Sequence, residues 1–175
     1  MHIKRNPLLY GAALAAFKML EAGVLVAVES KALPRTGLAF GFGYAADGKY
    51  VEVYGETAGT LDDPARFRNT LARKNMLTAE HRMPIHQLLA EYPELADVED
   101  TQYEGNAFCP VTGLIVGCSA ALGRTDRGFA EAGLALWKAG MGVKTAQLIT
   151  VARALKTDSI GEAAGLMAVA ASPAA

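Results

Sequence analysis

The chain has 175 residues, a length that fits one domain with at most a small appendage. Lys and Arg total 17 against 18 Asp and Glu, and the net charge of −1 argues against nucleic acid or an anionic membrane surface as a partner. The apolar fraction of 51% excludes wholesale disorder, and two cysteines exclude both a disulfide framework and a four-cysteine zinc site. We expect no membrane span, because no apolar run approaches the roughly 18 residues that a span needs. We therefore expect a cytoplasmic protein rather than a periplasmic or secreted one.

The first element in chain order is a predicted helix. Asn6 is a good N-cap, Pro7 suits the first helical position, and Gly23 is typical of a helix end. An apolar stripe at helical spacing is formed by Leu9, Ala13, Ala16 and Leu20. Lys4–Arg5 followed by an apolar stretch is also typical of a signal peptide, but the capping pattern favours a helix of the folded domain.

Three strands are predicted next. Val24–Val28 is β-rich and predicts a strand buried on both faces. Asp47–Gly48 is a strong turn signal, which predicts a hairpin of Leu38–Tyr44 with Lys49–Tyr54. Gly55–Asp63 is predicted to be a loop.

A second helix is predicted to begin at Pro64, capped by Asp62 or Asp63, and to end near Met83 before Pro84. Its core stripe is predicted to be Ala72, Met76, Ala79 and Met83. The following segment, Ile85–Gly105, is expected to hold a short helical piece and an acidic loop.

The remaining elements are two strands and three helices. Ala107–Val111 and Leu114–Leu122 are predicted strands joined by a turn at Thr112–Gly113. Helices are predicted at Gly128–Ala139, at Val143–Lys156 after Gly140 and Gly142, and from Ser159 onward. Strands linked by hairpins indicate an α+β domain with a mostly antiparallel sheet. We expect residues 1–140 to form this domain and residues 141–175 to form a C-terminal helical extension.

The polar face of the second helix is the first candidate site. Lys74, Thr78 and His81 stand at i, i+4 and i+7, opposite the predicted core stripe. Neighbouring candidates are Arg73, Arg82 and His86. An imidazole among cations could ligate iron or haem, or bind a carboxylate, and the alternative interpretation is an ordinary solvated helix face.

The two cysteines are the second candidate site. Cys109 lies in the run Phe108–Gly113, and Cys118 follows nine residues later. Both are expected in strands, where a cysteine commonly packs as a small buried apolar residue. The functional alternative is a thiolate nucleophile or metal ligand at Cys109, which needs an activating neighbour.

A third pattern is the glycine spacing Gly105, Gly113, Gly117 and Gly123. Strand entry, a turn and close packing explain such glycines. Followed by Asp126 and the helical run Phe129–Leu136, however, the arrangement resembles the GlcG/HbpS-like family of haem-binding domains, which includes the C-terminal domain of PduO-type proteins. Lys74 also stands ten residues before Pro84, as in that family, and the resemblance covers about residues 8 to 138.

The resemblance implies a PAS- or profilin-like domain with a five-stranded antiparallel sheet flanked by helices, to which this chain adds two C-terminal helices. It also implies a homo-oligomer that binds haem or a small anionic metabolite between the second helix and the segment Gly105–Gly113. His81 would then be a candidate axial ligand of haem, and Arg73 and Lys74 would offer charge to propionates or carboxylates.

Two other functions stay open. The chain could be an enzyme of small-molecule catabolism that uses Cys109 as nucleophile or His81 as acid and base. It could instead be an assembly module, because the helices after Gly140 carry the apolar stripes Leu148–Leu155 and Leu166–Val169.

Overall fold

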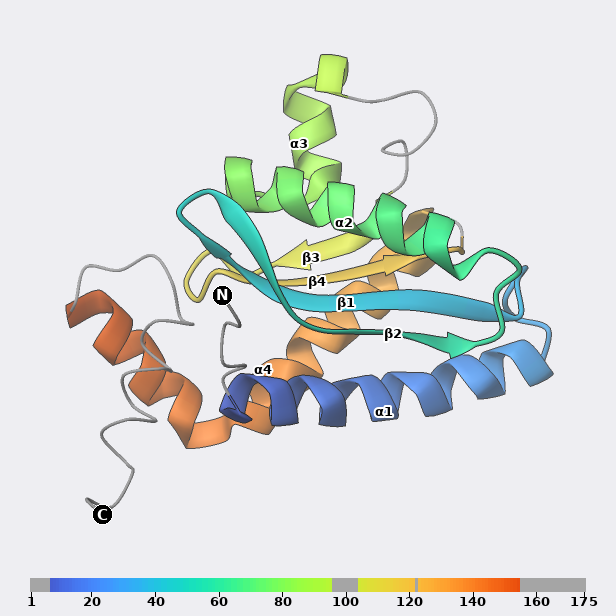
Figure 1. Ribbon diagram of the computed structural model, residues 1–175, viewed down its shortest axis with the longest axis horizontal. Coiled ribbons are helices and arrows are strands. Elements are labelled where there is room, and N and C mark those ends of the chain that lie inside the picture. Colours follow the sequence, from blue (N-terminus) through green and yellow to red (C-terminus); the bar gives the residue numbers. More distant parts are fainter. Residues whose placement is uncertain (1–6, 96–103, 122, 155–175) are drawn as a thin grey trace.

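The computed structural model describes residues 7–95, 104–121 and 123–154, the last of these with backbone alone beyond Met141 (Figure 1). These residues form an α+β fold. The helices are α1 (Pro7–Glu29), α2 (Pro64–His81), α3 (Ile85–Glu91) and α4 (Gly123–Ala154), with a 3₁₀ turn at Pro93–Leu95. The strands are β1 (Gly37–Ala46), β2 (Lys49–Gly59), β3 (Asn106–Phe108) and β4 (Leu114–Ser119).

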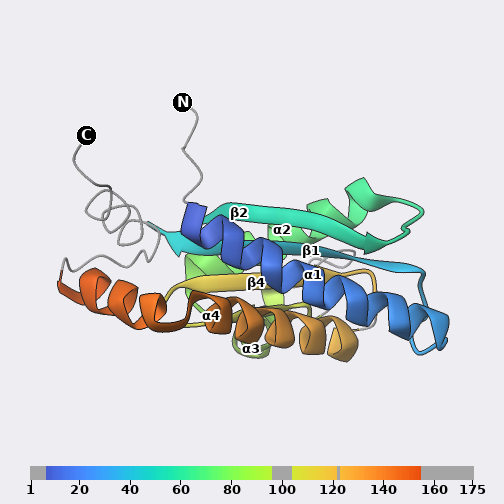
Figure 2. The same cartoon turned by 90° about the horizontal axis from the view of Figure 1, so that it is seen from below.

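The four strands form one antiparallel sheet in the order β2-β1-β4-β3. Helix α2 covers one face, while α1 and α4 lie side by side on the other face (Figures 1 and 2). The main core lies between the sheet and the α1–α4 layer, where Trp137 stacks edge-on against Phe42 with 5.6 Å between ring centroids. Strand β3 is the short edge strand of the sheet and is contacted by both α2 and α4.

The predicted hairpin is confirmed. Asp47 and Gly48 both have positive φ, and Ala46 pairs with Lys49 across the turn. The expected loop at Gly55–Asp63 was wrong in its first part, because β2 continues to Gly59, which pairs with Gly37.

The predicted strand at Val24–Val28 was wrong, since this segment is the end of α1. The predicted stripe of α1 is buried, and Val24 continues it one turn after Leu20, fully buried on the same face. Leu25 and Val26 are exposed, as a helix requires and a strand buried on both faces does not allow. The sheet of the described residues therefore has four strands rather than five.

The continuous α1 overturns the reason given for expecting no membrane span, while the expectation itself stays a prediction. Over Leu9–Glu29 its mean hydropathy is 1.7, and among the described residues it is the one helix long and apolar enough to cross a bilayer. Core helices of soluble proteins and signal sequences have the same length and composition, so this is weak evidence for a span.

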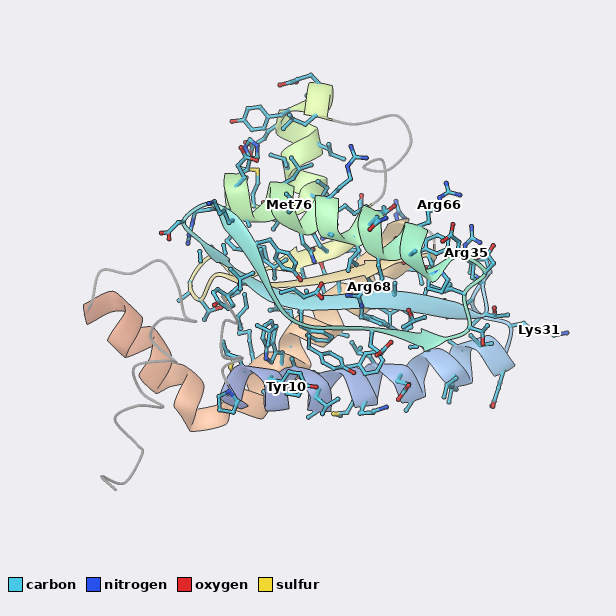
Figure 3. All side chains as sticks on the ribbon, viewed as in Figure 1. Tyr10, Lys31, Arg35, Arg66, Arg68 and Met76 are labelled. Carbon is cyan, nitrogen blue, oxygen red and sulfur yellow. The ribbon has the colours of Figure 1, made fainter. Side chains whose placement is uncertain are left out.

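Helix α2 begins as predicted but buries a different face. The Asp63 carboxylate accepts a hydrogen bond from the Arg66 backbone N–H at 3.0 Å, and Pro64 follows the cap. The predicted core stripe was wrong at Met76, which is 57% exposed (Figure 3), whereas Ala79 is buried as predicted. The buried face is instead largely polar: Thr70, Leu71, Lys74, Asn75, Thr78 and Ala79.

Glycines in the sheet explain how polar side chains fit under α2. A Cβ at Gly117 would lie 2.7 Å from Asn75 Oδ1, and a Cβ at Gly41 would lie 2.6 Å from Leu71 Cδ2. Because neither glycine has a side chain, α2 approaches the sheet closely enough to bury Asn75 fully.

The helices predicted at Gly128–Ala139 and Val143–Lys156 are one helix, α4, which also starts earlier, at Gly123. A glycine inside a helix costs only about 1 kcal/mol relative to alanine. At Gly140 a Cβ would lie 3.7 Å from Ala12, an ordinary van der Waals contact, so packing does not require glycine at this position. The expected boundary at residue 140 therefore falls within α4, while the apolar stripes predicted beyond it and the helix from Ser159 lie outside the described side chains.

Candidate ligand-binding cleft

A cleft of about 370 Å³ opens at the β3 edge of the sheet, between the start of α3, strand β3 and helix α4. Its volume falls in the range of small-molecule sites, about 300–1,000 Å³. The lining residues are Pro84, His86, Gln87, Asn106, Ala107, Phe108, Arg127, Glu131, Leu134, Ala135 and Lys138.

Helix α4 forms one long wall of the cleft. Arg127, Glu131, Leu134, Ala135 and Lys138 stand at i, i+4, i+7, i+8 and i+11, so they share one helical face. Arg127 and Lys138 are separated by about three turns, or roughly 16 Å along the axis.

Strand β3 runs alongside this wall in the same direction. Glu104, just before β3, lies with its carboxylate 3.5 Å from Arg127 Nη1. Cys109, just after β3, interacts electrostatically with the Lys138 ammonium, which lowers the pKa of its thiol. The cleft therefore has an Arg127 end and a Lys138 end, which we name by these residues.

The Arg127 end combines one cation with two carboxylates. Arg127 Nε donates to Glu131 Oε1 at 2.8 Å, in addition to the ion pair with Glu104. All three side chains are partly exposed, so each ion pair contributes little to stability, typically about 0–1 kcal/mol.

His86 lies in the cleft as a neutral imidazole. Burial lowers the pKa of His86 and the Arg127 guanidinium lowers it further, against smaller opposing contributions from Glu104 and Glu131. Its Nδ1 atom is buried and has no hydrogen-bond partner among the described residues. A neutral ring can accept a proton or ligate a metal ion, but it adds no positive charge to the cleft.

The Asn106 side chain fixes the start of α3 and with it His86. Its Oδ1 accepts a hydrogen bond from the Ile85 backbone N–H at 2.9 Å, and its Nδ2 donates to Thr78 Oγ1 at 2.7 Å and to the Lys74 carbonyl at 3.3 Å. The polar stripe of α2 thus contacts the candidate site indirectly, through Asn106, which accepts a hydrogen bond from the N-terminus of α3.

Lys74 belongs to a buried cluster on the far side of Gly105. Asp126 Oδ1 accepts hydrogen bonds from the Ala121 N–H at 2.9 Å and from Cys118 Sγ at 3.6 Å. Burial raises the pKa of Asp126, although the Lys74 ammonium opposes this, and burial likewise raises the pKa of the Cys118 thiol. A Cβ at Gly105 would lie 3.1 Å from Lys74 Nζ, so the glycine leaves the space that the lysine occupies.

Cys109 lies in a different environment, at the turn between β3 and β4. Burial raises the pKa of its thiol, but hydrogen bonds from the Thr112 hydroxyl and from the backbone N–H groups of Thr112 and Val111, together with the Lys138 ammonium, bring the pKa below its usual value. The turn itself requires Gly113, which has φ of 73°.

The structure separates most of the residues that the sequence grouped together. Lys74 and Thr78 face the sheet, and the His81 ring stacks on Tyr92 with 5.9 Å between centroids. The Arg82 guanidinium lies over the Phe108 ring at 6.0 Å, and Arg73 is exposed. Of the predicted ligand-binding residues, only His86 lines the cleft.

Sequence reasoning missed Gln87, Arg127, Glu131 and Lys138 as cleft residues. The signal for two of them was present, since Glu131 and Lys138 share one face of the predicted helix Gly128–Ala139, which Arg127 immediately precedes. What the sequence could not show is that this face lies opposite β3 and the start of α3.

Haem would need an imidazole and cations for its propionates. His81, the expected axial ligand, does not line the cleft, but His86, Arg127 and Lys138 do, so these are the residues that would hold the group. Among the described residues no group of three or more His, Cys, Asp or Glu could hold a metal ion. Comparison with protein families, curated proteins and solved structures found no match to the chain.

Proposed function

We propose that this chain binds a small molecule with an anionic group in the cleft between α3, β3 and α4. The observation that carries the proposal is the cleft wall itself, where Arg127 and Lys138 flank an apolar middle formed by Phe108 and Leu134. Small-molecule sites are usually concave and carry a few fixed polar groups, and this cleft is lined by both polar and apolar residues.

The wider setting is part of the same proposal. We place the chain near the GlcG/HbpS-like family, as a PAS- or profilin-like domain that acts as a cytoplasmic homo-oligomer. The antiparallel four-strand sheet with helices on both faces is compatible with that placement. Light scattering coupled to size-exclusion chromatography tests the oligomer, and a monomer at micromolar concentration would contradict it.

A carboxylate titration tests the binding site. Backbone amide NMR signals of Gln87, Phe108 and Ala135 are expected to shift saturably on addition of hexanoate, because the carboxylate would meet a cation and the alkyl chain would meet Phe108 and Leu134. Lys138→Gln should weaken binding. Lys31→Gln, at an exposed position that does not line the cleft (Figure 3), should leave it unchanged. An absence of saturable shifts would refute the proposal.

Haem is one specific candidate ligand, favoured by the neutral His86 imidazole beside apolar Phe108 and Leu134. The expected result is a saturable Soret shift on titration with hemin, lost in His86→Ala and retained in His81→Ala. Loss of the Soret shift in His81→Ala but not in His86→Ala would support His81 as the axial ligand of haem, as predicted from the sequence. No shift at equimolar hemin would exclude haem as the ligand.

A second candidate function is an enzyme with Cys109 as nucleophile. The specific observation is that the Thr112 and Val111 donors and the Lys138 ammonium favour the thiolate of Cys109, next to the Lys138 end of the cleft. Iodoacetamide labelling at neutral pH tests it: rapid alkylation of Cys109 supports a nucleophile, and an inert Cys109 contradicts it.

A further inference from the structure

The outer face of helix α1 is apolar, although no described element covers it. Among the described elements α1 packs on β1, β2 and α4, and its side turned away from the sheet stays uncovered (Figure 2). Over Leu9–Glu29 the mean hydropathy is 1.7, yet 33% of the window is buried. A helix that is apolar on all sides normally lies in the core of a larger structure or in a bilayer.

The large exposed side chains of α1 lie in the second half of the helix. Met19, Leu25 and Val26 are 61%, 47% and 65% exposed, and they are three of the six large apolar side chains that are exposed among the described residues. Clustered apolar side chains of this kind, unlike scattered ones, mark an interaction surface.

A stripe of four exposed residues in this half of α1 is complementary to itself. Lys18, Ala22, Leu25 and Glu29 stand at i, i+4, i+7 and i+11, so they share one face of the helix. The intervals of four, three and four residues are the same in both directions along the chain. A second α1 in antiparallel orientation therefore places Lys18 opposite Glu29, and the large Leu25 opposite the small Ala22.

Charge favours a second copy of the chain as the partner. An antiparallel pair brings Lys18 of each copy to Glu29 of the other, whereas a parallel pair in register would place like charges together. Lys18 Nζ already lies 2.7 Å from Glu21 Oε2 of its own helix, but an ammonium has three donors and can contact a second carboxylate as well. In a bilayer, by contrast, Lys18 and Glu21 would both lie within the span, which is costly.

We propose that the second half of α1 is the contact surface for a second copy of this chain, with the two helices antiparallel and Lys18 of each beside Glu29 of the other. This inference rests on the homo-oligomer of the proposed function and names its interface. The paired segment spans roughly three helical turns, or about 18 Å. So short a contact makes a small interface, and we expect a reversible dimer rather than a permanent one.

Charge reversal tests this pairing. Sedimentation velocity of the full chain over a series of concentrations gives the dissociation constant of the dimer. Lys18→Glu and Glu29→Lys are each expected to weaken the dimer roughly tenfold, because two exposed ion pairs per dimer change from attraction to repulsion. The double variant Lys18→Glu/Glu29→Lys exchanges the two charges, so it should restore most of the wild-type affinity.

Leu25→Glu tests the apolar centre of the contact. The new carboxylate would face Ala22 of the second copy, so this variant should be monomeric at every concentration that dimerises the wild type. Met76→Glu is the matched control, because Met76 is also an exposed apolar residue but lies on α2, at the opposite face of the sheet (Figure 3). It should leave the dissociation constant unchanged. The fluorescence of the buried Trp137 shows whether each variant is folded.

The outcomes separate this inference from the proposed function. If the two single charge variants dimerise as tightly as the wild type, the interface lies elsewhere, which overturns the inference and leaves the homo-oligomer standing. A wild-type monomer that co-sediments with phosphatidylcholine vesicles would assign the apolar face to lipid and overturn the inference. A monomer that binds no vesicles overturns it together with the homo-oligomer. The anion site in the cleft is tested independently by the hexanoate titration.

Discussion

Asn106→Ala is the substitution that tests most directly how the cleft is held together. Asn106 is 1% exposed, and its side chain accepts from the Ile85 N–H and donates to Thr78 Oγ1 and the Lys74 carbonyl. Alanine would leave the Ile85 N–H and the Thr78 hydroxyl without this partner. Each buried group left without a partner costs about 1–3 kcal/mol, so the two together predict a loss of about 2–6 kcal/mol in the free energy of unfolding.

The single Trp of the chain makes the measurement straightforward. Trp137 is fully buried, and its Nε1 donates to the Leu9 carbonyl at 3.2 Å, so its fluorescence should change when the core opens. In urea denaturation followed at this Trp, Asn106→Ala should lower the midpoint strongly, whereas Asn69→Ala, at an exposed position of α2, should shift the free energy by less than about 0.5 kcal/mol. A loss below about 1 kcal/mol in Asn106→Ala would show that the network does not hold the α3 start in place.

The remaining predictions test other parts of the structure. Gly117→Ala should destabilise the fold by about 1–3 kcal/mol, because the new methyl group would overlap Asn75 and Leu71, and a neutral result in denaturation would contradict the close approach of α2 to the sheet. Gly23→Ala, where nothing lies within 4 Å of the added Cβ, should stabilise α1 by about 0.5–1 kcal/mol because Gly23 lies inside the helix, and a loss of stability would contradict the continuous α1. Because the pKa of His86 is lowered in the folded state, the unfolded chain binds its proton first, so this residue should reduce stability as pH falls below about 6.5. His86→Gln should weaken that pH dependence, and an unchanged slope would contradict the shift. Mass spectrometry after iodoacetamide treatment should find Cys109 alkylated before Cys118, whose thiol pKa is raised by burial, and the reverse order would contradict both pKa directions.

Local signals in the sequence predicted the elements that local chemistry determines. The turn at Asp47–Gly48 and the cap at Asp63 depend on residues within three positions of each other, and both are confirmed. The prediction of a strand at Val24–Val28 was wrong, because the β-branched valines favour a strand only where tertiary packing does not impose another structure. Here the buried stripe of α1 continues through Val24, so packing overrides the local preference.

The candidate site was harder to predict because it joins segments that are distant in the chain. Its walls come from α3, β3 and α4, and His86 and Lys138 are 52 positions apart. The sequence did indicate that His86 and nearby cations could bind an anion, but it assigned the cations to α2. No periodicity within α2 or α4 reveals which helix faces the edge strand, because that depends on the order β2-β1-β4-β3.

The buried polar face of α2 shows why a functional pattern can be recognised and still be misassigned. Lys74 and Thr78 share one helix face, and a polar stripe opposite alanines and methionines ordinarily faces solvent. In this fold the glycines at positions 41, 105 and 117 leave room beneath α2, and Asn106 and Asp126 supply polar partners there. The polar stripe of α2 therefore contacts buried protein groups rather than a ligand. Through Asn106 it nevertheless determines where α3 begins, and so where His86 lies in the cleft. Its effect on ligand binding is expected to be indirect: Thr78→Val should reduce stability and displace the cleft signals of α3, without removing any group that touches the ligand.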